Sequence, residues 1–144
     1  MDEGWLRRWQ AIGEAALAVI DGGDVARTGS PSQVDVIVVD DAAIAKLHGE
    51  FLQDPTPTDV MTFPTDEGGE IVISIETAER QAAEFGNSIG REACLYIVHG
   101  LLHLCGYEDQ STEGSAEMDI RQEALLEKAE RRAAGDSGTR DSSD

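Results

Sequence analysis

The stretch that decides the fold is residues 88–106, SIGREACLYIVHGLLHLCG, where apolar side chains occur on almost every side of a predicted helix. Asn87 or Ser88 can begin this helix, and Gly106 stands where a C-terminal cap belongs. A helix that is apolar nearly all round has to be buried, so we expect it to run through the centre of the domain.

The segments on either side predict further helices. Apolar residues at helical spacing predict helices over residues 5–20, 76–85 and 118–132, the last with Ile120, Leu125 and Leu126 facing inward. A shorter helix is expected to begin at Asp40 or Asp41 and to carry Ile44, Leu47 and Phe51.

Three β-branched or apolar runs predict strands, over residues 34–39, 60–63 and 70–75. The first run has a length that suits a sheet covered on both faces. The other two runs either form a hairpin or lie farther apart in the sheet.

The length of 144 residues fits one domain, expected over residues 1–132, and residues 133–144 are expected to form a disordered acidic tail. No stretch approaches the roughly 20 apolar residues that span a bilayer, and the acidic start lacks the layout of a secretory signal. We therefore expect a cytoplasmic protein with no membrane partner. Cys94 and Cys105 would lie roughly 16 Å apart along one helix, so reduced thiols are expected, with Cys105 in the core.

The charge narrows the choice of partners. The chain has 29 acidic and 11 basic residues, a formal net charge of −18. Such a surface repels nucleic acid in general, because nucleic-acid binders neutralise phosphates with lysine and arginine. Composition alone argues against a nucleic-acid enzyme, and it is consistent with a cationic partner or with a metal that supplies local positive charge.

His99 and His103 lie four residues apart on the most apolar helix, so their imidazoles project from one face and can reach one metal ion. After Gly106, a sharp turn would bring Glu108 or Asp109 toward them. His99, His103 and Asp109 thus form a candidate open zinc site with room for water. The competing interpretation is a coincidence of two packed histidines. A closed structural zinc site is disfavoured because such sites are rich in cysteine.

These residues resemble a known family. The segment 99–107, HGLLHLCGY, is similar to the H-G-x-L-H-L-x-G-Y-D-H signature of the YbeY family of bacterial rRNA maturation factors. Residues 57–64, PTDVMTFP, resemble its P-T-D-V-L-S-F-P segment, and residues 69–74, GEIVIS, its G-D-I-x-I-S strand. The likeness covers roughly residues 5–130, and the motifs together are highly specific.

The resemblance implies an α+β fold, with a small mixed sheet of three to four strands packed against about five helices and the HxxxH helix buried at the centre. It implies a zinc ion held by three histidines, of which His99 and His103 match the first two. It also implies a metal-dependent, single-strand-specific endoribonuclease that acts in 16S rRNA processing, with ribosomal RNA or the small ribosomal subunit and its basic proteins as partners.

The chain departs from the family pattern at the third ligand. The family histidine falls on Asp109, and the aspartate before it falls on Glu108. A carboxylate can still bind the metal. Its negative charge weakens the Lewis acidity of the ion, raises the pKa of the bound water and favours harder ions such as manganese.

Two further departures lie upstream. Leu52 takes the place of an arginine that many members carry, so a cation that could steady the transition state is missing there. The amino-terminal strand that usually opens the fold has no counterpart before Trp5, so the sheet can be one strand shorter. His48 is either a stray ligand or, as we expect, a surface histidine. Thr58 and Asp59 either order the metal site or contact its bound water, or they only close a turn through side-chain to backbone hydrogen bonds.

Three functions are consistent with these residues. The first is the nuclease, in which zinc held by His99, His103 and Asp109 activates water. The second is a ribosome-associated maturation factor with weak or no nuclease activity, which the net charge and the missing arginine favour. The third is a metal-dependent hydrolase of a small substrate.

Overall fold

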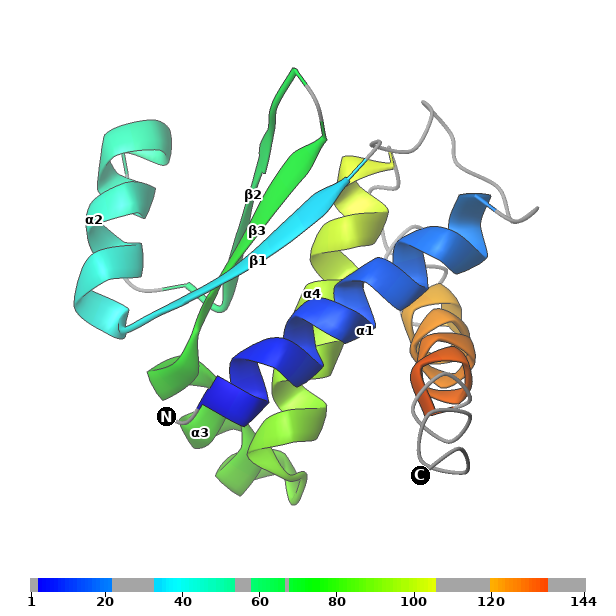
Figure 1. Ribbon diagram of the computed structural model, residues 1–144. Helices are drawn as coiled ribbons and strands as arrows, with labels where there is room; N and C mark the ends of the chain where they lie inside the picture. Colours follow the sequence, from blue (N-terminus) through cyan, green and yellow to red (C-terminus); the bar gives the residue numbers. More distant parts are fainter. Residues whose placement is uncertain (1–2, 22–32, 54–57, 67, 106–119, 135–144) are drawn as a thin grey trace.

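The computed structural model describes residues 3–21, 33–53, 58–66, 68–105 and 120–134 (Figure 1). Along the chain they form α1 (Glu3–Asp21), β1 (Val34–Val39), α2 (Asp41–Leu52), β2 (Val60–Pro64), β3 (Gly69–Ser74), α3 (Ile75–Phe85) and α4 (Ile89–Leu104). A further helix covers residues 120–134. Every helix and strand predicted from the sequence is therefore present.

The sheet is mixed, in the order β1-β3-β2. β1 runs parallel to β3, with Val34 opposite Gly69, and β2 runs antiparallel to β3, with Val60 opposite Ile73. The hairpin is thus the correct alternative for β2 and β3. Its turn is closed by hydrogen bonds between Thr65 and Gly68. The fold is α+β, with three strands among the described residues.

Helices cover both faces of this sheet. α1 and α4 lie against one face, α2 lies on the other, and helix 120–134 packs on the far side of α1 and α4 (Figure 1). Successive side chains of β3 point to opposite faces of the sheet, so this strand contributes to two separate hydrophobic clusters. Ile71 and Ile73 join the larger cluster with α1 and α4, whereas Val72 joins Ile44 and Met61 on the α2 side.

The sheet that contains residues 34–39 is covered on both faces, as their pattern predicts (Figure 1). This strand lies at the sheet edge, however, and the covering is incomplete there, since Asp35 and Ile37 are exposed. A run of apolar residues does not reveal which strand lies at the edge of a sheet.

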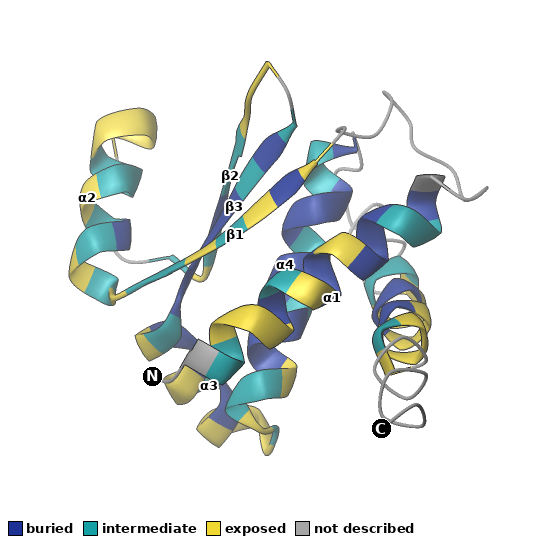
Figure 2. Cartoon of the chain, viewed as in Figure 1, coloured by how far each residue is buried: buried dark blue, intermediate teal, exposed yellow. Residues whose placement is uncertain are grey.

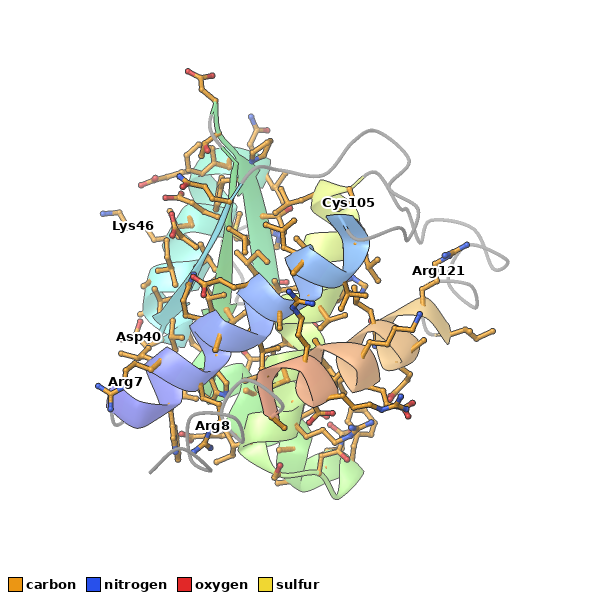
Figure 3. All side chains as sticks on the ribbon, turned by 45° about the vertical axis from the view of Figure 1, so that its right-hand side comes forward. Arg7, Arg8, Asp40, Lys46, Cys105 and Arg121 are labelled. Carbon is orange, nitrogen blue, oxygen red and sulfur yellow. The ribbon has the colours of Figure 1, made fainter. Side chains whose placement is uncertain are left out.

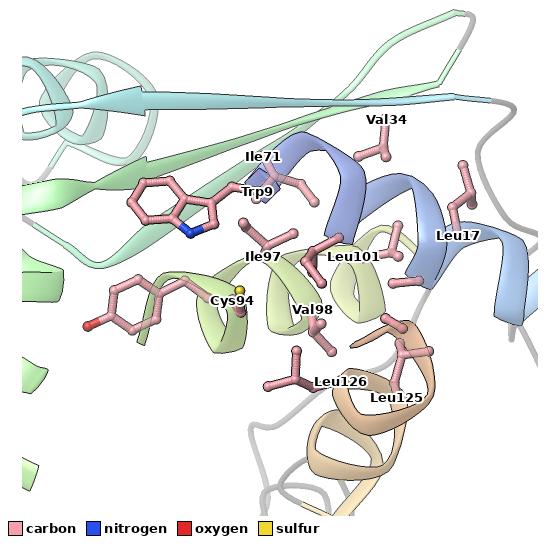
Figure 4. Close-up of a cluster of buried hydrophobic side chains, with 14 of the residues drawn as sticks. Trp9, Leu17, Val34, Ile71, Cys94, Ile97, Val98, Leu101, Leu125 and Leu126 are labelled. Carbon is pink, nitrogen blue, oxygen red and sulfur yellow. The ribbon is translucent and has the colours of Figure 1, made fainter. Parts of the chain in front are cut away.

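α4 is the buried centre of the domain, as predicted (Figure 2). Its residues Ile97, Val98 and Leu101 have no exposed surface, and they contact side chains from α1, β3 and helix 120–134 (Figure 4). Gly100 allows the close approach of α4 to the sheet, because a Cβ there would lie 2.9 Å from Cγ2 of Ile71 and 3.0 Å from Cγ2 of Thr62.

The helix starts resolve two alternatives that the sequence left open. The Asp40 carboxylate accepts a hydrogen bond from the backbone N–H of Ala43, so Asp40 rather than Asp41 caps α2. The Ser88 hydroxyl accepts one from Arg91, so Ser88 rather than Asn87 caps α4. At the other end the cap of α4 is Cys105, and the predicted cap Gly106 lies outside the described residues.

In helix 120–134, one of the three residues predicted to face the core does not. Leu125 and Leu126 are buried as expected, but Ile120 is 71% exposed. Five residues before Leu125, Ile120 falls about 140° away around the helix, because each residue turns it by about 100°. The helix reaches residue 134, and residues 135–144 of the expected tail lie outside the described residues.

Cys94 and Cys105 are both buried, Cys105 in the core as predicted. Burial raises the pKa of the Cys94 thiol to about 11. No helix in the described part of the chain is both long and apolar enough to cross a membrane.

Candidate functional site

His99 and His103 meet in the C-terminal half of α4, where His103 lines a cleft with β2 and His99 contacts helix 120–134. Their Nε2 atoms lie 3.0 Å apart, and the two rings stand edge to face with centroids 4.6 Å apart. Both residues are half-buried. The spacing of four residues therefore brings the two rings together on one face of the helix, with their Nε2 atoms at hydrogen-bonding distance from each other.

Gln122 orients the first of these histidines. Its Oε1 accepts a hydrogen bond from Nδ1 of His99 at 2.9 Å, which places the ring hydrogen on Nδ1 and the lone pair of a neutral ring on Nε2. Helix 120–134 packs on the core through Leu125 and Leu126, which are buried. Next to Gln122, Nη2 of Arg91 of α4 donates to both carboxylate oxygens of Glu123 at 3.0 and 2.8 Å, an exposed ion pair that adds little to this packing.

The donor set suits a divalent cation. A histidine ligand commonly donates its second ring N–H to a carboxylate or carbonyl oxygen, which is what His99 does toward Gln122. Two imidazole nitrogens on one tetrahedral zinc lie about 3.3 Å apart, given Zn–N bonds of about 2.0–2.1 Å. The separation of 3.0 Å between the two Nε2 atoms needs only a small adjustment to reach this value. These two residues can hold a metal.

The remaining predicted ligands are not placed. Asp109 and its alternative Glu108 lie outside the described residues, and within the described ranges no group of three His, Cys, Asp or Glu side chains could hold a metal ion. Cys105 is fully buried in the core, as expected.

An open cleft of about 550 Å³ adjoins the histidine pair. His103 lines it from α4, and the polar groups that share its walls are His48 from α2, Thr58 and Thr62. His48 was expected to be a surface histidine unrelated to the site. It is half-buried and lines the same cleft as His103.

The other walls of the cleft are apolar. Phe51, Leu52 and Phe63 line it together with residues 60 and 61. Leu52 is 64% exposed at the end of α2. The described lining contains no lysine or arginine. Lys46, also on α2, extends away from the sheet (Figure 3).

Thr58 and Asp59 have different positions. Thr58 lines the cleft, whereas the Asp59 carboxylate accepts a hydrogen bond from the backbone N–H of Val60 at 2.8 Å. The Thr58 hydroxyl donates to the same carboxylate at 3.4 Å, and the Asp59 carbonyl accepts from the N–H of Ser74. Asp59 thus makes the hydrogen bonds expected of a residue that closes a turn, which is one of the two roles considered for it. These bonds join the start of β2 to the end of β3.

Sequence reasoning missed Gln122 and underrated His48. The signal for Gln122 was present: it lies three and four residues before Leu125 and Leu126, on the apolar face of its helix. A polar side chain at such a position needs a buried partner. His48 carries no comparable signal, because its role depends on where α2 ends relative to β2.

Comparison with known proteins places this arrangement in a family. The family model described as Endoribonuclease YbeY matches residues 7–130. The chain is 40% identical over 111 residues to the Endoribonuclease YbeY of Moorella thermoacetica, covering 66% of this chain and 71% of the relative. It is 45% identical over 102 residues to that of a Synechococcus strain, covering 62% and 64%.

A solved structure agrees. The solution structure of TM1509 from Thermotoga maritima is similar over 100% of this chain and 92% of that one, with a TM-score of 0.63 and 29% identity. A match of the family model over most of the chain, relatives at these identities and a shared fold lead to one conclusion. The chain belongs to the YbeY family.

Proposed function

We propose that this chain is a metal-dependent endoribonuclease that cleaves single-stranded RNA in the cytoplasm during the maturation of 16S rRNA. Relatives in several bacteria carry the name Endoribonuclease YbeY, which supports the nuclease class. The observation that carries the proposal is the convergence of His99 and His103 Nε2, with His99 oriented by Gln122. The partner in this proposal is ribosomal RNA or the small ribosomal subunit with its basic proteins.

His99, His103 and an oxygen from Asp109, or from Glu108, would hold one zinc ion or a harder divalent ion. Bound there, the ion would supply a Lewis acid that lowers the pKa of water and polarises a phosphoryl oxygen. The chain's own residues do the positioning: Gln122 keeps the lone pair of His99 on Nε2, and His103 presents its ring to the cleft. The cleft can then hold the RNA strand beside the histidines.

Metal content tests the site. We expect wild-type protein loaded with zinc and dialysed to retain about one zinc per chain by elemental analysis, and His103→Ala to retain far less. Phe85→Leu is a control, because Phe85 is exposed at the end of α3, outside the cleft. Equal and negligible zinc in wild type and His103→Ala would contradict the metal site.

Cleavage tests the activity. Single-stranded RNA is incubated with zinc or manganese, beside a duplex of the same sequence. We expect single strands to be cut and the duplex to be spared. Activity should fall by orders of magnitude in His99→Ala. RNA that stays intact with every metal would contradict the nuclease.

One observation favours a second function. The described lining of the cleft contains the exposed Leu52 and no lysine or arginine, and the chain carries a net charge of −18. A ribosome-associated factor with weak or no nuclease activity would bind basic ribosomal proteins through its acidic surface and use the metal for stability. Intact RNA together with retained binding to ribosomal subunits would identify this alternative.

A further inference from the structure

An aromatic pair, of which one ring is exposed, lines the cleft together with His103. Phe51, at the end of α2, is 60% exposed, and its ring meets that of Phe63 of β2 with centroids 5.1 Å apart and an interplanar angle of 68°. Both rings line the cleft that His103 also lines. Because the two rings are steeply inclined to each other, a flat molecule that stacks on the face of one ring has its edge next to the other ring.

Phe51 is not needed to fill the core. The contact of α2 with the sheet is made by Ile44, which is fully buried, and by Leu47, which packs on the cluster of Met61 and Val72. Phe63 also packs on this cluster, so it gives the pair a fixed base. A large ring left mostly in solvent, next to a site with polar groups, indicates a surface for a ligand.

The chemistry of the walls selects the kind of ligand. The described lining offers no lysine or arginine for a phosphate, and the chain as a whole is strongly acidic. What it offers is aromatic and aliphatic surface, with the hydroxyls of Thr58 and Thr62 and the ring of His48 as hydrogen-bonding groups. Such walls suit an uncharged, planar ring with polar edges, which is the description of a nucleobase.

We propose that Phe51 and Phe63 form a stacking subsite for one unpaired nucleobase of the RNA strand, next to His103. This inference rests on the proposed function and adds to it how an acidic protein holds its substrate. Binding comes from stacking of a base rather than from pairing with phosphates. An unpaired base is required because a base in a duplex has both faces covered, so the subsite itself selects single strands.

The experiment measures binding without cleavage. The probe is a short single-stranded oligoribonucleotide with one 2-aminopurine, whose fluorescence falls when it stacks, and the protein is the full chain in EDTA. Phe51→Leu removes the aromatic face at an exposed position, Phe51→Tyr keeps it, and Phe85→Leu is the matched control. Phe85 is 65% exposed at the end of another helix and does not line the cleft. Thermal midpoints confirm that all variants fold.

We expect Phe51→Leu to weaken binding about 5-fold to 100-fold, the range found when a stacking aromatic is removed. Phe51→Tyr and Phe85→Leu should bind like wild type. An unlabelled oligonucleotide that is abasic at the probed position, measured by its competition with the 2-aminopurine probe, should bind as weakly to wild type as the intact one does to Phe51→Leu. Affinity should change little between low and moderate salt, because few phosphates are neutralised.

The outcomes separate this inference from the proposed function. Binding that is equal in Phe51→Leu and Phe85→Leu, or equal for intact and abasic strands, overturns the subsite even if RNA is cleaved. Binding that depends on Phe51 without cleavage in any metal supports the subsite and contradicts the nuclease. Unchanged RNA binding with lost binding of Phe51→Leu to ribosomal proteins would show that the pair contacts protein, and would also overturn the inference.

Discussion

Oε1 of Gln10 accepts a hydrogen bond from the backbone N–H of Val36 at 2.8 Å, which joins α1 to the outer edge of β1. Nε2 of the same amide donates to the Val34 carbonyl at 2.9 Å. One amide thus makes the two bonds that a residue of a neighbouring parallel strand would make. Residues 34–36 of this edge strand therefore bond to a side chain of α1 on the side away from β3.

Replacing Gln10 should destabilise the fold without touching the site. Gln10→Leu leaves two half-buried backbone groups unpaired, so we expect a loss of about 1–3 kcal/mol in the free energy of unfolding. Urea unfolding measures it. Arg8→Leu, at an exposed position of the same helix, is the control and should change stability by less than about 0.5 kcal/mol. Equal losses in both variants would contradict the role of the amide.

Gln122 should set metal affinity through His99. Gln122→Ala removes the acceptor that fixes the His99 ring, so we expect zinc affinity to fall about 10-fold to 100-fold, measured by competition with a chromophoric chelator. Gln122→Glu keeps an acceptor oxygen and should retain most of the affinity. Lys128→Ala, at an exposed position of the same helix, should bind zinc like wild type. Full affinity in Gln122→Ala would show that His99 needs no such partner.

A cation at position 52 should strengthen RNA binding. Leu52 is exposed in the cleft, so Leu52→Arg can place a guanidinium there at little structural cost. We expect tighter binding of single-stranded RNA and a steeper salt dependence, by about one unit in the slope of log K against log salt. Leu6→Arg, at an exposed position of α1, controls for the change in net charge. An equal gain in both variants would show that position 52 is not special.

Gly100 should be irreplaceable for packing, unlike a second glycine on the same helix. Gly100→Ala forces its Cβ to 2.9 Å from Ile71 and should cost about 1–3 kcal/mol in the free energy of unfolding. A Cβ at Gly90 meets nothing within 4 Å, so Gly90→Ala should stabilise by about 0.4–1 kcal/mol. Chemical unfolding of both variants is the measurement. A stabilising Gly100→Ala would mean that α4 does not lie this close to the sheet.

Asp41 should make stability depend on acid pH. Its carboxylate accepts hydrogen bonds from Arg80 at 2.6 Å, Ser74 at 2.6 Å and Thr77 at 2.8 Å, which join α2 to the start of α3. These bonds, that of Arg80 first, lower the pKa of Asp41 from 3.8 to about 2.

Because the folded pKa lies below the unfolded one, this contribution is present above about pH 4 and is lost as pH falls through 2. We expect Asp41→Asn to be less stable than wild type at pH 6, and the difference between them to shrink between pH 4 and pH 2. Urea midpoints across this range measure it. Asp66→Asn, in the exposed turn between β2 and β3, should show no such trend. A difference that is constant with pH would contradict the assignment.

The approach of the two histidines was predictable because it depends on spacing within one helix. His99 and His103 share a helix face because they are four residues apart, and their Nε2 atoms lie 3.0 Å from each other. The cleft was not predictable in this way. It combines His48 of α2, Phe63 of β2 and His103 of α4, and no local pattern records how the end of one helix lies relative to a strand and a second helix.

The sequence by itself determined the order of helices and strands, the burial of α4 and the family, because periodicity and motifs are local properties of the chain. Only the tertiary structure decided that β1 lies at an edge, that Ile120 faces solvent and that Gln122 reaches His99. The physical reason is that these contacts join residues distant in the chain. Their formation depends on how whole faces pack together, which no single segment specifies.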